Sequence, residues 1–292
     1  MQLQATHHGV LDPDSRAFYQ SAMRALQRDG VPFLVGGAYS FARYTGIERH
    51  TKDFDIFVLP QDCQRALRSL YAAGYRTELT FPHWLGKAFW GSSFVDVIFG
   101  SGNGVARVDE QWFEHSSESE VLDIPVLLCP VEETIWSKAF IMERERYDGA
   151  DIAHLLRVRA PELDWSRLLR RFGPHWRVLL GHLVLFGFIY PSERDLIPRW
   201  VMDRLLAELK LESTIPPPDD KVCQGTLFSR AQYLVDTEYW RYQDARLIPA
   251  GSMSQKQIDY WTAAIDKEPP TELVRPAATA EEFPPPKPHH FS

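Results

Sequence analysis

Asp53 and Asp55 are separated by one residue in an apolar segment, residues 53–59, that we expect to be a strand. Side chains two apart on a strand point to the same face, so the two carboxylates lie side by side while Phe54 and Ile56 point into the core. Two like charges held that close repel each other unless a cation lies between them. Mg²⁺ prefers a few carboxylates together with water and substrate phosphates, so the pair predicts a magnesium site. The alternative is a solvated strand end without metal.

Asp96 is a third candidate, because it alone interrupts the apolar strand expected at residues 94–99. Burying a lone ionised carboxylate costs several kcal/mol unless it is paired or binds metal. Next to Asp53 and Asp55, it would complete a site for two metal ions and accept the proton of an attacking hydroxyl. The alternative is a hydrogen-bonded structural aspartate.

Gly36 and Gly37 lie between a short apolar strand, residues 31–35, and a helical segment, residues 38–44. Backbone amides at a helix N-terminus attract anions, and glycine lets a phosphate come close to the backbone. This segment predicts a phosphate cradle, in which we include Ser40. The same pair of glycines is equally typical of an ordinary tight turn.

Three cations are candidates for contact with a triphosphate. Arg49 and Lys52 lie just before the aspartate pair, although exposed loop cations are also common there. Lys138 lies within an apolar stripe on the helix expected at residues 131–147. Its ammonium either binds an anion or reaches water at the end of its long side chain, and the sequence leaves both open. Asp148 is expected to cap the next helix, with Asp151 in its first turn.

The elements that position these residues divide the chain in two. Up to residue 130 strands and helices are mixed, and from residue 131 nearly everything is helical. We expect an α+β protein with a small mixed β-sheet flanked by helices, followed by an all-helical C-terminal region. The predicted domains are residues 1–130, residues 131–265 and a proline-rich, disordered tail at residues 266–292. The expected helices are 15–29, 38–44, 61–73, 131–147, 148–160, 163–172, 176–190 and 195–211; the expected strands are 31–35, 53–59, 75–81, 87–90, 93–99 and 124–128.

Composition narrows the function classes. With 32 Lys and Arg against 39 Asp and Glu in 292 residues, the net charge of −7 argues against non-specific binding to DNA. The three cysteines are far apart, so neither a zinc site nor a disulfide framework is indicated. The most apolar stretch, residues 178–190, is shorter than the about 20 residues of a membrane span and is expected to be a buried helix. We expect a cytoplasmic protein without a membrane partner.

The spacing of Gly36-Gly37, Asp53-x-Asp55 and the later Asp96 resembles the nucleotidyltransferase superfamily typified by DNA polymerase β. The likeness covers residues 32–100 well and the helical half loosely, and it is greatest to the antibiotic-nucleotidyltransferase and AbiEii-type toxin branch. Members commonly have Gly-Ser where this chain has Gly-Gly. In the toxin-like branch a helix lysine approaches the nucleotide and an acidic residue follows it, which makes Lys138 and Asp151 the corresponding candidates.

The resemblance implies transfer of a nucleoside monophosphate from a nucleoside triphosphate to a hydroxyl acceptor, with release of pyrophosphate. Two Mg²⁺ ions would bind to Asp53, Asp55 and Asp96, and the acceptor would be a small molecule, a transfer RNA end or a protein side chain. The alternative is a nucleotide-binding or partner-binding protein of the same fold without turnover, such as one half of a toxin-antitoxin-like pair. A third carboxylate in an apolar strand favours the enzyme, because a protein without turnover has no use for it.

Overall fold

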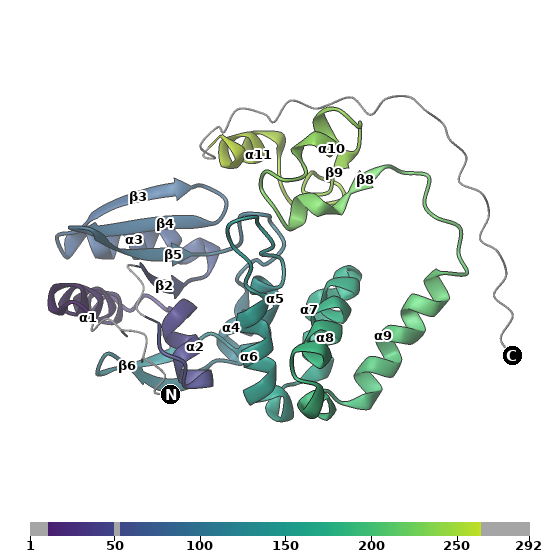
Figure 1. Ribbon diagram of the computed structural model, residues 1–292. Helices are drawn as coiled ribbons and strands as arrows, with labels where there is room; N and C mark the ends of the chain where they lie inside the picture. Colours follow the sequence, from purple (N-terminus) through teal and green to yellow (C-terminus); the bar gives the residue numbers. More distant parts are fainter. Residues whose placement is uncertain (1–10, 50–52, 264–292) are drawn as a thin grey trace, which may run out of the picture.

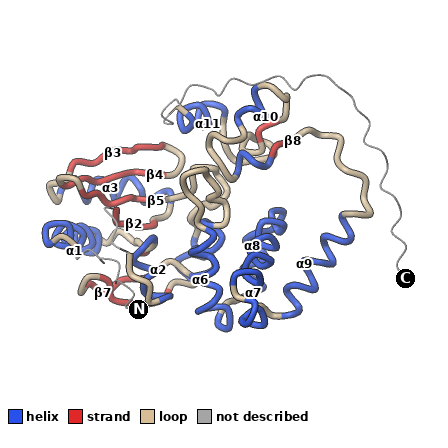
Figure 2. The backbone as a smooth tube through the Cα atoms, viewed as in Figure 1, coloured by secondary structure: helices blue, strands red, loops and turns tan. Residues whose placement is uncertain are grey.

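The computed structural model describes residues 11–49 and 53–263. The main sheet and its helices form one side of the molecule, and a group of helices forms the other (Figure 1; Figure 2). The predicted class, α+β with a small mixed sheet and a helical C-terminal region, is confirmed.

The main sheet has seven strands in the described part of the chain, in the order β3-β4-β5-β2-β1-β7-β6. Pairing is parallel between β2 and β5 and between β1 and β7, and antiparallel elsewhere. The strands are β1 (Leu34–Val35), β2 (Asp53–Phe57), β3 (Arg76–Phe81), β4 (Leu85–Trp90), β5 (Ser93–Ile98), β6 (Ser117–Val121) and β7 (Ile124–Leu128).

One face of this sheet is covered by α1 and α3. Phe54 and Ile56 of β2 are fully buried, and the Phe54 ring stacks on Tyr19 of α1. Asp53 and Asp55 therefore point to the opposite face, as the alternation of the strand predicts. The helices of this half are α1 (Pro13–Arg28), α2 (Gly37–Thr45), α3 (Cys63–Ala72) and α4 (Glu110–Glu114).

The second half begins after Pro130. Its helices are α5 (Val131–Lys138), α6 (Gly149–Arg159), α7 (Trp165–Phe172), α8 (Trp176–Ile189), α9 (Arg199–Glu212), α10 (Leu234–Glu238) and α11 (Gln255–Thr262). Two short strands, β8 (Val222–Cys223) and β9 (Gln243–Asp244), form a separate parallel pair between α9 and α11. Pro216–Pro218 lie in the exposed connection that precedes β8, as expected of a linker.

Three expectations from the sequence were wrong in detail. The helix expected at residues 131–147 ends at Lys138, because the next residues form a loop held by other parts of the chain. In that loop the Met142 amide donates to the Phe228 carbonyl, and Glu143 accepts bonds from the Arg230 amide and the Ser229 hydroxyl. The expected elements also lack the edge strand β6, the short helix α4, and β8, β9, α10 and α11 near the C-terminal end of the described chain.

The third error concerns the apolar helix near residue 180. Only one face of α8 is buried, through Leu179, Leu183 and Phe186, whereas Phe188 on the other face is 82% exposed. Within the described residues, the segment Trp165–Ile189, which covers α7 and α8, is long and apolar enough to cross a membrane by length and composition alone. In its most apolar stretch, 33% is buried. The domain limits at 130 and 265 stay predictions, and the tail at 266–292 lies outside the described residues.

A buried ion-pair network joins α5 to α7. Arg167, 5% exposed, binds Glu132 and Glu133 of α5, and Glu133 is fully buried. Arg171 also binds Glu133 and extends the network to Asp109. Removal of one partner would leave a buried charge uncompensated. The network therefore fixes α5, and with it Lys138, against α7.

We expect Arg167→Met to lower the free energy of unfolding by about 3 kcal/mol, since it leaves the buried Glu133 with fewer counter-ions. Urea unfolding measures this. Arg170→Met, an exposed arginine on the same helix, is the control and should change stability by less than about 0.5 kcal/mol. Equal losses in the two variants would contradict the role given to the network.

Candidate active site

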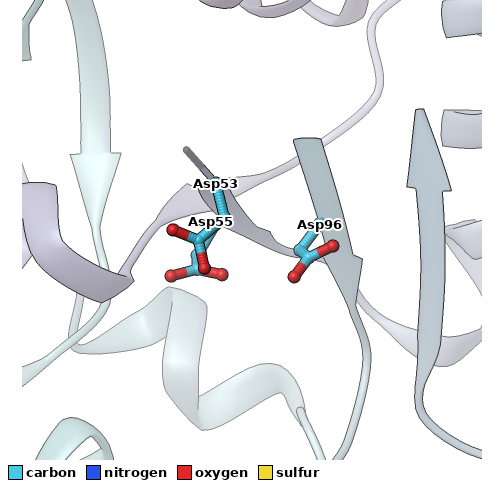
Figure 3. A group of neighbouring side chains, drawn as sticks. All are labelled: Asp53, Asp55 and Asp96. Carbon is cyan, nitrogen blue, oxygen red and sulfur yellow. The ribbon is translucent and has the colours of Figure 1, made fainter. Parts of the chain in front are cut away.

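Three carboxylates from two neighbouring strands converge on one point. Asp55 of β2 lies directly opposite Asp96 of β5 in the parallel register, and Asp53 lies two residues before Asp55. One oxygen from each carboxylate lies within 4.8 Å of the others (Figure 3). The sequence predicted this convergence, and the observed geometry fits a shared cation because carboxylate oxygens at such separations can bind the same ion.

Two of the three carboxyl groups have raised pKa values. Burial raises the pKa of Asp55 to about 7, and the charges of Asp96 and Asp53 add to the rise. Burial also raises the pKa of Asp96, while a hydrogen bond from Lys87 acts in the opposite direction. Both carboxyl groups therefore hold protons more readily than an exposed aspartate, as expected where like charges meet without a cation.

Lys87 is a partner of the triad that the sequence analysis missed. It lies on β4 directly opposite Asp96 in the antiparallel register, and its Nζ donates to Asp96 Oδ1 at 2.6 Å. The side chains of Lys87 and Asp96 are only 19% and 13% exposed. The compensating partner that the sequence required for Asp96 is thus present within the chain.

The two predicted glycines have different tasks. The Gly36 amide donates to the Asp55 carbonyl at 3.0 Å, so it is engaged in the sheet, and a Cβ on Gly36 would overlap the Phe57 ring. Gly37 has a φ of +54°, and a Cβ there would lie 1.7 Å from Asp55 Oδ2. The first helical amides of α2, from Gly37 to Tyr39, precede the Ser40 amide that makes the first bond within the helix. A phosphate cradle would thus use Gly37 and the residues after it, and the expectation that Gly36 offers its own amide was wrong.

Ser40 also differs from the expectation. It is fully buried, and its hydroxyl donates to the Gly37 carbonyl at 3.2 Å. Ser40 therefore supports the backbone at Gly37 and does not present its side chain to a ligand.

The predicted cations form a mixed cluster with acids beside the triad. Lys138 Nζ lies 2.8 Å from both Asp148 and Asp151, and Arg49 binds Asp151 from the other side. Arg146 binds Asp148. Lys138 and Arg146 are close enough to Asp55 to oppose the rise of its pKa.

This cluster decides between the two alternatives for Lys138 and corrects the role expected of Asp148. The Lys138 ammonium binds anions, and these are the carboxylates of Asp148 and Asp151. Asp148 makes no capping hydrogen bond with its side chain; although burial acts to raise its pKa, Arg146 and Lys138 hold that pKa below the usual range. Arg146 was missed, and Lys52 lies outside the described residues.

No family model matches the chain, and no curated protein matches it. Solved structures of nucleotidyltransferases do match. The antibiotic-resistance factor ANT(2'')-Ia is 13% identical over 70% of this chain and 100% of its own, with a TM-score of 0.37. The lincosamide antibiotic adenylyltransferase LnuA, bound to lincomycin, is 16% identical over 51% and 99%, with a TM-score of 0.38.

A third match is an antigenic nucleotidyltransferase-like protein from Paracoccidioides brasiliensis. It is 14% identical over 64% of this chain and 95% of its own, with a TM-score of 0.39. All three matched structures are at most 16% identical to this chain.

Gly37→Ala should displace the Asp55 carboxylate, because the new Cβ would overlap Oδ2. We expect binding of Mg²⁺, followed by isothermal titration calorimetry, to weaken roughly 10–100-fold, as for other changes that misplace a metal ligand. Gly46→Ala is the matched control: its φ is +73° but nothing lies within 4 Å of the added Cβ. Similar affinities in the two variants would mean that backbone strain alone matters.

Asp55→Asn should stabilise the metal-free protein at pH 8. A carboxyl whose pKa is raised to about 7 on folding contributes stability at low pH, and that contribution is lost as the pH rises toward 7. We expect a gain in the free energy of unfolding of about 1–3 kcal/mol at pH 8 and a much smaller one at pH 4. Chemical unfolding in EDTA at the two pH values measures it. An equal change at both would show that the charge of Asp55 is not the cause.

Proposed function

We propose that the chain is a nucleotidyltransferase that moves a nucleoside monophosphate from a nucleoside triphosphate to a hydroxyl acceptor and releases pyrophosphate. The observation that carries the proposal is the convergence of Asp53, Asp55 and Asp96 beside the N-terminus of α2. Three carboxylates serve to hold a divalent cation, and helix amides serve to hold phosphate. The two together suit a metal-bound triphosphate.

The residues fit a magnesium ion. The donors are all carboxylate oxygens, which Mg²⁺ prefers. Burial raises the pKa of Asp55 and of Asp96, and the neighbouring carboxylates add to the rise. Asp53 and Asp55 would hold the ion, with Asp96 beside them. Magnesium bound there supplies positive charge to the phosphate oxygens and so stabilises the charge that develops in the transition state.

The chain's own groups divide the remaining tasks. The amides of Gly37 and the following residues would donate to phosphate oxygens, and the cluster of Arg49, Lys138 and Arg146 would attract the triphosphate. Asp96 would accept the proton of the acceptor hydroxyl, a task for which a pKa above that of an exposed aspartate is suited. Most of the catalysis would then be positioning and charge neutralisation.

The test is label transfer from α-labelled nucleoside triphosphates in the presence of Mg²⁺. A small hydroxylated molecule, transfer RNA and protein are each offered as acceptor. We expect transfer in the wild type and a loss of roughly 10²–10⁴-fold in Asp55→Asn and Asp96→Asn. Glu120→Gln, an exposed acid on β6 of the same sheet, is the control and should leave transfer unchanged.

Two outcomes would contradict the proposal. Transfer that survives Asp53→Asn combined with Asp55→Asn would refute the metal assignment. Thermal stabilisation by Mg²⁺ and nucleotide, without product from any acceptor class, would favour a protein that binds nucleotide without turnover.

A further inference from the structure

Four charged residues form a row across four adjacent strands. The pairing register places Glu78 of β3 opposite Lys87 of β4, Lys87 opposite Asp96 of β5, and Asp96 opposite Asp55 of β2. Residues directly opposite each other share a face of the sheet. Lys87 is therefore a cation built into the same row as two of the three site carboxylates.

Lys87 is committed to Asp96 and not to its other acidic neighbour. Glu78 already accepts hydrogen bonds from Arg76 and Thr80, at 3.0 Å each. Lys87 Nζ lies 2.6 Å from Asp96 Oδ1 and 4.0 Å from the centre of the Phe94 ring, on which it rests. An ammonium held by a carboxylate on one side and an aromatic face on another, with 19% of the side chain exposed, has a fixed position.

A second metal ion would have to share Asp96 with Lys87, which already donates to its Oδ1. Two ions in a shared site lie about 3.5–4 Å apart and share carboxylates, whereas here an oxygen of the third carboxylate already binds an ammonium. A second dication would have to displace Lys87 or lie against its positive charge.

We propose that Lys87 takes the place of a second metal ion, so that the site binds one divalent ion, on Asp53 and Asp55, beside a lasting ion pair between Lys87 and Asp96. The inference rests on the proposed function and replaces the two ions that the three carboxylates predicted. In it Lys87 is a positioning residue, which holds Asp96 where the acceptor hydroxyl must arrive.

The inference is tested by counting bound ions without measuring activity. Mn²⁺ is titrated into the purified full-length chain and followed by electron paramagnetic resonance, alone and with α,β-methylene ATP, whose bridging carbon the transfer reaction cannot cleave. Ions bound to the analogue alone are subtracted. We expect one Mn²⁺ per wild-type chain in both titrations, without the spectrum of a coupled pair.

Variants of Lys87 test whether its charge sets the number of bound ions. Lys87→Met keeps the length and apolar stem but removes the charge, and should bind two Mn²⁺ with a coupled spectrum. If Lys87→Met does not fold, Lys87→Gln is used in its place. Lys87→Arg retains the charge and should bind one. Arg76→Met is the matched control, because it removes a cation from the next strand that binds Glu78 and not the triad.

The outcomes separate this inference from the proposed function. Two coupled ions in the wild type, or one ion in both charge-removing variants, would overturn the role of Lys87 and leave nucleotidyl transfer standing. Absence of bound Mn²⁺ from the wild type under all conditions would overturn both.

Discussion

The repulsion between Asp55 and Asp96 is the constraint on which the site depends. Their strands pair in parallel and in register, so the two carboxylates lie directly opposite each other, and like charges in that relation destabilise a sheet. Asp53 adds a third charge from the same strand. Each neighbouring feature bears on this conflict: Lys87 binds Asp96, Lys138 and Arg146 oppose the rise of the Asp55 pKa, and Gly37 leaves space for the Asp55 carboxylate. A fold that retains such a conflict gives up stability at this point, which is a recurrent property of functional sites.

Much of the site could be predicted from local pattern, because strand alternation and hairpin register are local rules. Asp53 and Asp55 share a face by their spacing alone, and Phe54 and Ile56 are buried as the alternation requires. The hairpin register also identifies Lys87 as the partner of Asp96. β4 and β5 are joined by a two-residue turn, with Trp90 opposite Ser93, and counting back three pairs places Lys87 opposite Asp96. The strands were expected, but the register between them was not worked out, so the partner of Asp96 was missed.

Other features depend on contacts between segments far apart in the sequence and had no local signal. Beyond Lys138 the expected helix still contains good helix formers such as Ala139 and Met142. It nevertheless ends at Lys138, because Ser229 and Arg230 hold the loop around Glu143. The capping role expected of Asp148 is likewise overridden by its ion pairs with Lys138 and Arg146. A cap hydrogen bond contributes about 1 kcal/mol, whereas a buried carboxylate left without a counter-ion costs several, so the ion pairs prevail. A glycine pair that suits a phosphate also suits a sheet end packed against Phe57. The sequence does not distinguish these two roles for Gly36, whereas the structure does.

The charges around the triad fall into two groups. Under the proposed function, an anionic substrate would leave the ion pair of the first group in place and exchange those of the second. Lys87 lies within the sheet, and its acidic partner among the described residues is Asp96, so this ion pair is part of the fold. Arg49, Lys138 and Arg146 are instead matched by Asp148 and Asp151, which leaves the cluster with one more positive than negative charge among these five residues. Arg146 is 64% exposed and Arg49 is 42% exposed, so solvent screens their ion pairs and little free energy is lost when they turn to another anion. A triphosphate carries more charge than either carboxylate and would compete for these cations from the open side. Under the proposed function, Asp96 would thus keep a fixed counter-ion, whereas the cations of the second group would exchange theirs for the substrate.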